Sequence, residues 1–144
     1  METIVIDLRH PAIAAFLAWI IPGAGHFYQR RYFKAGVFSV CVLGCYFLGL
    51  ALGDGHVVYA SWTREDPRWQ YVLQAGVGLP ALPALVQSRR VMAREEPLIA
   101  DVMAPPRQPV RLKDHDHLAS WHLKLGAYFD LGTLYTMIAG LLNV

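Results

Sequence analysis

Four stretches of about twenty residues with almost no charge divide this chain and limit what it can fold into. No Lys, Arg, Asp or Glu falls in residues 10–29, 35–53 or 69–88, and residues 125–144 contain a single one, Asp130. The hydrocarbon core of a membrane is about 30 Å thick, and an α-helix needs about 20 apolar residues to cross it. The sequence therefore predicts an all-α integral membrane protein with four transmembrane helices.

The composition agrees with this prediction. Hydrophobic residues make up 55% of the chain and charged residues only 17%, whereas a soluble domain carries about 25% charged residues. The net charge of +2 is too small to indicate a nucleic-acid partner. Glu2, Asp7 and Arg9 do not form the basic region of a signal peptide. We therefore expect the first apolar stretch to remain as a membrane anchor.

The spans are expected at about residues 11–28, 35–53, 70–87 and 124–144, within a single membrane domain covering residues 1–144. Ten of the thirteen Lys and Arg residues lie in two connections, 29–34 and 87–124. Basic residues in short loops stay on the cytoplasmic side of a membrane. The charge distribution therefore predicts an N-out/C-out protein of a bacterial inner membrane, with a cytoplasmic loop at about residues 88–123.

Prolines and glycines predict irregularities within these spans. Pro22 and Gly23 interrupt the first stretch, so we expect a kink or a broken end there. Pro80 and Pro83 predict a kink in the third stretch. In the connection before the fourth span, Asp114 is expected to cap a helix that runs straight into that span.

Small residues recur where helices are expected to pack. They are Cys41, Cys45, Gly49 and Gly53 at intervals of four in the second span, and Gly132, Thr133, Thr136, Gly140 and Asn143 on one face of the fourth. In lipid, small side chains let two helix backbones approach closely, and polar ones bond between helices. Both rows are therefore predicted to face other helices. The cysteines are interpreted as small packing residues, with thiol chemistry as the alternative.

Asp130 is the only acidic or basic residue within a predicted span. A carboxylate in a membrane is costly and normally faces a partner inside the bundle. The favoured interpretation is a structural pair with His26, Arg30 or Arg31, which are expected at the same depth on the first hairpin. Two others stay open: a proton or ion relay with His26, and a solvated position at the membrane interface.

No pattern of catalytic, cofactor-binding or metal-ligating residues stands out. His115, His117 and His122 are separated by two and then five positions, a spacing that fits no standard zinc site. The sequence has no Walker loop, GxSxG or HExxH motif. We expect neither a catalytic site nor a cofactor, and ligation of a haem by His26 is an open alternative.

The stretch Leu17–Tyr28, with Pro-Gly-Ala-Gly near its end, and the basic turn before Lys34-Ala-Gly resemble the opening hairpin of the two-transmembrane-helix (TM-two) domain family. Arg30 stands where that family usually has a glycine. The whole chain also resembles uncharacterised four-span bacterial membrane proteins, which share an ending similar to Tyr128–Asn143. These resemblances imply a membrane fold and location and no particular activity.

These observations favour a non-enzymatic multi-pass membrane protein. We expect a structural or accessory subunit that contacts the lipid bilayer and other membrane helices, either within the chain or in a larger complex. The alternative is a small transporter or ion-pathway component that uses Asp130, Gln74 and His26. A membrane enzyme ranks third.

Overall fold

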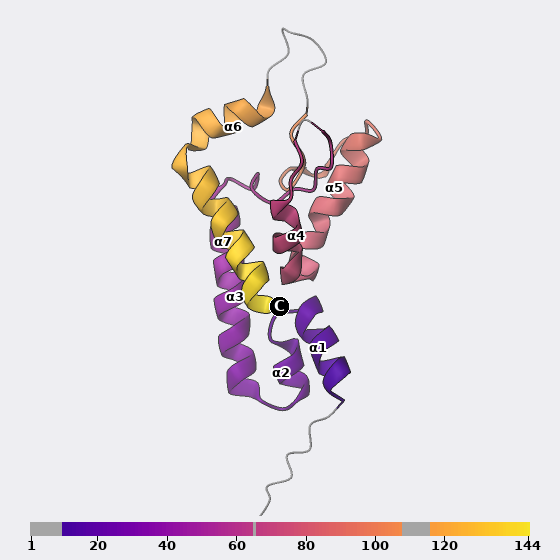
Figure 1. Cartoon of the computed structure of the whole chain (residues 1–144), viewed down its shortest axis with the longest axis vertical. Helices are drawn as coiled ribbons and strands as arrows, with labels where there is room; N and C mark the ends of the chain where they lie inside the picture. Colours follow the sequence, from indigo (N-terminus) through magenta and orange to yellow (C-terminus); the bar gives the residue numbers. More distant parts are fainter. Residues whose placement is uncertain (1–9, 65, 108–115) are drawn as a thin grey trace, which may run out of the picture.

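The computed structural model describes residues 10–64, 66–107 and 116–144. Its elements are α1 (Pro11–Ile20), α2 (Ala24–Tyr28), α3 (Tyr32–Leu52), α4 (Gln70–Gln74), the 3-10 helices η1 (Ala75–Val77) and η2 (Leu79–Ala81), α5 (Leu82–Met92), the short strand β1 (Leu98–Asp101), α6 (His117–Leu125) and α7 (Ala127–Asn143). The described residues form an elongated fold built almost entirely of helices, so the predicted all-α class is confirmed (Figure 1). We call the end at the α2–α3 turn the lower end and the end at α6 the upper end.

Helix α3 has the length and composition of a membrane span. It covers 21 residues, and its apolar window has a mean hydropathy of 2.2. Only 22% of that window is buried, whereas a core helix that is apolar all round is buried in a soluble protein. Among the described residues, α3 is the one helix that qualifies alone, and α6 with α7 qualify only as a pair bent by 98°. The prediction of four spans is therefore not confirmed.

Helix α7 runs antiparallel to α3 along its upper part (Figure 1). It does not continue α6 in a straight line, as the sequence predicted, because Gly126 at φ +52° turns the chain between the two helices. The cap of α6 is Asp116, whose carboxylate accepts a hydrogen bond from the Ala119 amide at 3.2 Å. The predicted cap Asp114 lies outside the described residues.

The first apolar stretch folds back on itself. Helix α1 ends at Ile20, Gly23 takes a positive φ of +84°, and α2 returns toward the lower end (Figure 1). The Ser39 hydroxyl of α3 donates a hydrogen bond of 2.7 Å to the Pro22 carbonyl and holds the turn. The break expected at Pro22 and Gly23 is present, and it reverses the chain. We call α1 and α2 the lower hairpin.

The third apolar stretch is also a hairpin. Helices α4 and η1 descend from the upper end, Gly78 turns the chain at φ +85°, and η2 and α5 return upward (Figure 1). Two tyrosine hydroxyls hold the turn, because Tyr46 donates to the Pro80 carbonyl at 2.9 Å and Tyr71 donates to the Ala81 carbonyl at 2.8 Å. We call these four elements the upper hairpin.

The two hairpins meet about half-way along the molecule (Figure 1). A side chain at Gly78 would collide with the carbonyls of Trp19 and Ile20 at the end of α1. The last turn of α7 ends at the same place, where Asn143 bonds to both hairpins. The C-terminal ends of α1, η1 and α7 therefore converge on one junction.

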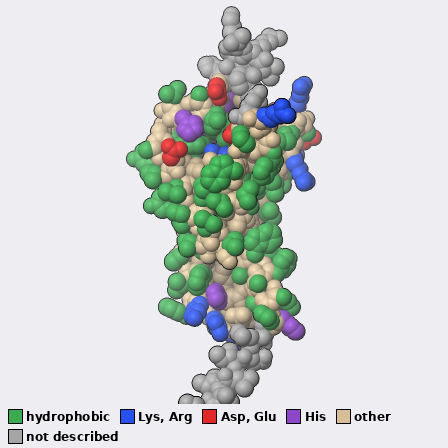
Figure 2. Space-filling view, viewed as in Figure 1, with side chains coloured by type: hydrophobic (Ala, Val, Ile, Leu, Met, Phe, Trp, Pro, Cys, Tyr) green, Lys and Arg blue, Asp and Glu red, His purple; other side chains and the backbone are tan. Residues whose placement is uncertain are grey.

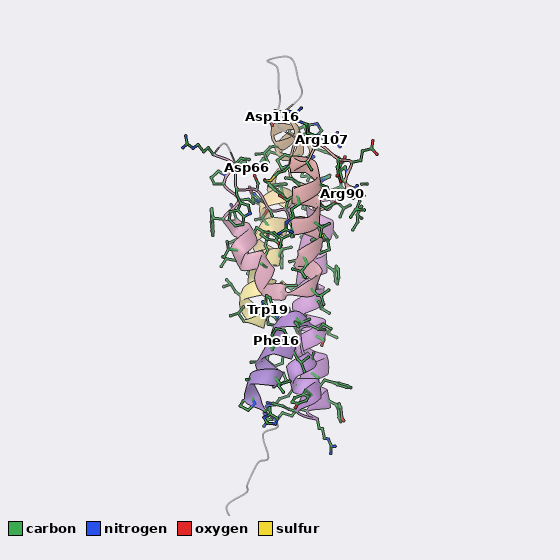
Figure 3. The ribbon with its side chains drawn as sticks, turned by 90° about the vertical axis from the view of Figure 1, so that its right-hand side faces the viewer. Phe16, Trp19, Asp66, Arg90, Arg107 and Asp116 are labelled. Carbon is green, nitrogen blue, oxygen red and sulfur yellow. The ribbon has the colours of Figure 1, made fainter. Side chains whose placement is uncertain are left out.

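This arrangement changes the expected topology. The segments 54–64, 66–69 and 93–107 lie at the upper end, across which Figure 3 labels Asp66, Arg90 and Arg107. The turn at residues 29–31 lies at the lower end (Figures 1 and 3). The two basic connections predicted to share one cytoplasmic side thus lie at opposite ends of α3. The reason is that a hairpin returns to the side from which it starts, whereas a full span does not. The N-out/C-out assignment rests on four full spans and, like them, is not confirmed.

The hydrophobic core fills the upper part of the molecule. It lies between α3, α7, the upper hairpin and the connecting segment 57–60, in which every residue is fully buried. Helix α6 is fixed across this core, because Trp121 stacks on His56 with ring centroids 4.4 Å apart. Lys124 adds an ion pair with Asp54 at 2.8 Å.

Candidate functional site: a polar seam along α7

Five polar side chains line the inner face of α7 and its neighbours. They are Arg68, Gln74, Thr133, Thr136 and Asn143, and we call them the polar seam. The three α7 members are spaced by three and seven residues, which places them on one face of a helix. Because α4 and η1 pack against that face, the polar groups of both elements meet inside the protein.

Arg68 forms the upper end of the seam. Its side chain is buried, and Nη2 donates hydrogen bonds of 3.1 Å to the Val57 carbonyl and to the Thr133 hydroxyl. The guanidinium also lies 4.5 Å from the centre of the Tyr59 ring and 5.3 Å from that of Phe129, a favourable cation–π arrangement. Burial lowers the pKa of Arg68, while Tyr59 and the nearby carboxylates oppose that shift. An arginine remains charged under such conditions.

Gln74 occupies the middle of the seam and is fully buried. Its amide nitrogen donates to the Val57 carbonyl at 3.1 Å and to the Thr136 hydroxyl at 2.9 Å. The Thr136 hydroxyl lies within donating distance of the Gly132 and Thr133 carbonyls of its own helix. The amide oxygen of Gln74 has no partner among the described residues. Arg68 and Gln74 therefore share Val57 as an acceptor and fix the segment 57–60 against α7.

Asn143 forms the lower end of the seam. Its amide nitrogen lies 3.1 Å from the Ala18 carbonyl of α1 and 3.0 Å from the Gly76 carbonyl of η1. Carbonyls at a helix C-terminus lack partners within the helix. One side chain of α7 thus satisfies such groups on both hairpins and joins their tips.

Glycines let α7 approach its neighbours closely enough for these bonds. A Cβ atom at Gly49 would lie 2.7 Å from the Gly132 carbonyl, and one at Gly76 would lie 2.5 Å from the Gly140 carbonyl. Backbone contact of this kind is typical of small-residue helix packing in membranes.

The four small residues predicted to form one packing row on α3 have different neighbours in the structure. Gly49 packs on α7, and the Cys45 thiol donates to the Tyr135 carbonyl at 3.3 Å. Gly53 packs against the Val57 side chain and also lies beside Gly132 of α7, whereas Cys41 is exposed. The row therefore faces protein at three of its four positions.

The predicted pairing of Asp130 with the first hairpin requires correction. Asp130 is exposed in the first turn of α7, at the upper end, because Gly132 lies beside Gly49 and Gly53 near the end of α3. Arg30 and Arg31 precede the other end of α3, and a 21-residue helix is about 30 Å long. Asp130 is therefore an exposed residue at the upper end and is not a partner of the first hairpin.

The histidines do not assemble a metal site within the described residues. His117 lies edge-on to Trp121, and His122 packs against Phe129. His115, the third member of the predicted group, lies outside the described residues. His26 packs on Phe38 at 4.9 Å in the lower part of the molecule, far from Asp130, so the structure does not place the two residues of the predicted relay together.

Sequence reasoning placed Asn143 and the threonines on the inner face of α7 and missed Arg68. Arg68 stands in the polar segment between the second and third apolar stretches, where a charged residue is expected to be exposed. The signal for its burial is weak: it lies two residues before the start of α4, in a Pro-Arg-Trp sequence without a neighbouring acid at 67 or 69. The seam contains no histidine, cysteine or carboxylate, so the chemistry it offers is hydrogen bonding.

Comparisons with curated proteins and with solved structures found no match. The resemblance of the first hairpin to the TM-two family therefore stays an expectation. A family model described as "Family of unknown function (DUF6677)" matches residues 13–144. That range covers both hairpins, α3 and the whole polar seam. The chain belongs to this family of unknown function.

Proposed function

We propose that this protein is a non-enzymatic, multi-pass membrane protein that acts as a structural or accessory subunit. The observation that carries the proposal is the contrast between its inside and its outside. The buried polar side chains bond mainly to one another and to backbone carbonyls of the same chain. On the face that Figure 2 shows, hydrophobic side chains cover the outside between the two charged ends.

The outer hydrophobic surface supports a membrane environment. On α3, Phe33 is 85% exposed and Val40 is 73% exposed, and Leu141 of α7 is 56% exposed. Contiguous apolar surface of this kind is rare on soluble monomers and marks contact with lipid or with other proteins. Charged side chains gather at the two ends, as expected for groups at membrane–water interfaces (Figure 2).

In the proposed arrangement α3 crosses the bilayer, and α7 enters antiparallel to α3 from the upper side and ends at the junction of the two hairpins. Each hairpin enters from its own side and returns to it. Irregular backbone at membrane depth is tolerated where protein buries it. Both turn glycines, Gly23 and Gly78, are buried. The assignment to a bacterial inner membrane rests on the resemblance to four-span bacterial proteins alone.

The exposed face of α3 is the surface proposed to meet a partner helix, since Val40 and Phe47 both project from it. The test is purification in a mild detergent, followed by identification and quantification of co-purifying membrane proteins. We expect a partner at a fixed ratio that is lost in Val40→Ala/Phe47→Ala and kept in Leu134→Ala/Leu141→Ala. A protein that purifies alone and monodisperse would contradict an accessory role.

A second candidate is a small ion-pathway component. Broken helices that meet half-way across a membrane form the binding sites of many transporters, and the Gln74 amide oxygen is buried there without a partner among the described residues. Asp130 and His26 are not part of this candidate, because they lie far apart. Purified protein in liposomes with a trapped pH-sensitive or cation-sensitive dye should then show flux that Gln74→Leu reduces. Flux equal to that of empty liposomes would exclude the candidate.

A further inference from the structure

The turn between α2 and α3 concentrates positive charge at the lower end. Arg30, Arg31 and Lys34 lie within five positions, and residues 10–53 contain no Asp or Glu. The ion pairs among the described residues, Arg90 with Glu95 and Lys124 with Asp54, both lie elsewhere. On the face that Figure 2 shows, basic side chains gather at this end, and no acidic side chain of the described residues lies beside them. We call Arg30, Arg31 and Lys34 the basic corner.

The backbone of the turn adds to this positive potential. Arg31 is the N-cap of α3, no side chain caps the helix, and its first turn holds no acidic residue. The first amides of a helix lack partners within the helix and carry partial positive charge. The Arg30 and Arg31 amides bond to the Phe27 and His26 carbonyls at 2.9 Å. The turn is therefore internally bonded and presents its arginines from a defined backbone.

An apolar groove begins at Tyr32, next to the turn that carries Arg30 and Arg31. It has a volume of about 400 Å³ and lies between α2 and α3, with Phe27 and Tyr32 at the corner and Pro22 and Ser39 at its inner end. From Tyr32 to Ser39 it extends about 10 Å along α3. The Ser39 hydroxyl is bonded to the Pro22 carbonyl, so this side chain does not make the groove polar.

We propose that the basic corner binds the phosphate of an anionic phospholipid, one acyl chain of which enters the groove between α2 and α3. This proposal rests on the membrane location proposed above. Guanidinium groups match phosphate oxygens in charge and geometry, and the uncapped start of α3 favours an anion. The adjoining apolar groove selects a lipid over a free phosphate, because a soluble phosphate ester has no group to fill it.

The test is native mass spectrometry of the full chain released from a mixed bilayer of phosphatidylglycerol and phosphatidylcholine with identical acyl chains. We expect the parent protein to retain phosphatidylglycerol preferentially. The variant Arg30→Gln/Arg31→Gln/Lys34→Gln should reduce that preference by at least about tenfold, because basic residues at an anionic surface supply the attraction. The matched control Arg89→Gln/Arg90→Gln/Arg94→Gln removes three cations from the upper end and should keep the preference.

A second pair of variants tests the groove. Gly36 lines it, and a Cβ there would meet no atom within 4 Å, as at Gly44 elsewhere on α3. Gly36→Leu should weaken phosphatidylglycerol retention without unfolding the protein, and Gly44→Leu should not. If Gly36→Leu leaves phosphatidylglycerol retention unchanged, or if glycerol 3-phosphate displaces the lipid fully, then no acyl chain occupies the groove. The basic corner would then be a simple phosphate site. An inserted protein with no lipid preference would overturn this inference alone, whereas a chain that does not enter the membrane would overturn the proposed function.

Discussion

Gly49 of α3 and Gly132 of α7 face each other with their backbones in contact. A Cβ at Gly49 would lie 2.7 Å from the Gly132 carbonyl, and one at Gly132 would lie 2.5 Å from the Gly49 carbonyl. Neither helix can carry a side chain at this point without moving the other. The contact thereby sets the position of α7, on which the polar seam and the junction of the two hairpins depend.

Gly49→Leu should therefore destabilise the protein by about 1–3 kcal/mol or more, the range found when a packed interface is overfilled. Gly44→Leu is the matched control, because Gly44 lies on the same helix with no atom within 4 Å of an added Cβ. Thermal unfolding of both variants in the same detergent compares them. Equal unfolding temperatures would show that the two helices do not meet at Gly49.

Removal of the Gln74 side-chain amide from the polar seam should lower the free energy of unfolding. Gln74→Leu preserves much of the volume but removes two buried hydrogen bonds, to the Val57 carbonyl and to the Thr136 hydroxyl, and a hydrogen bond contributes about 0.5–1.5 kcal/mol to stability. Thr136→Val removes the other partner of the Gln74 amide. In a double-mutant cycle of unfolding free energies, these two changes should be non-additive. Additive losses would mean that the two side chains do not interact.

Loss of the charged group should lower the stability of the protein at Arg68 and have little effect on it at Asp130. Arg68→Met should destabilise the fold, because it removes both hydrogen bonds of a buried guanidinium. Its control, Arg64→Met, changes an exposed arginine of the same segment. Asp130→Leu should alter stability by no more than about 0.5 kcal/mol, as is usual for exposed positions. A larger loss at Asp130 than at Arg68, measured by denaturation, would restore a structural role for that carboxylate.

The long uncharged stretches of the sequence predicted the helical class. They also predicted the position of α3, to within three residues at its start and one at its end. The sequence also predicted the break at Pro22 and Gly23. It did not predict that the stretches 11–28 and 70–87 reverse direction, because a hairpin and a full span need the same apolar length. The reversal depends on Gly78 at φ +85° and on its contact with the end of α1, which are tertiary features.

The small-residue face of α7 was also readable from the sequence, since helical spacing alone places Gly132, Thr136 and Gly140 together. The partner of Asp130 was not. Its expected depth followed from four full spans, and that assumption put the start of the fourth span beside the first hairpin. Once the third stretch folds back, the start of α7 lies at the upper end, and Asp130 lies about the length of α3 away from Arg30 and Arg31.

The ion pair between Asp54 and Lys124 gives a pH dependence at the upper end. The hydrogen bond from Lys124 lowers the pKa of the Asp54 carboxyl. A lowered pKa in the folded state means that the contribution is present above the ordinary aspartate value of about 3.9 and is lost as the pH falls through the folded value. In an NMR titration Asp54 should have a depressed pKa that Lys124→Met returns toward the ordinary value. An unchanged pKa in that variant would show that the pair does not form in solution.

In the proposed arrangement, two of the four apolar stretches return to the side of the membrane from which they start. Cysteine labelling can test this after Cys41 and Cys45 are replaced with alanine. Single cysteines at Arg64, Glu96 and Lys34 are exposed to a membrane-impermeant maleimide in intact and in lysed cells. The structure predicts that Arg64→Cys and Glu96→Cys are labelled from the same side and Lys34→Cys from the other. Labelling of Arg64→Cys and Glu96→Cys from opposite sides would contradict the upper hairpin and restore a full span between residues 70 and 87.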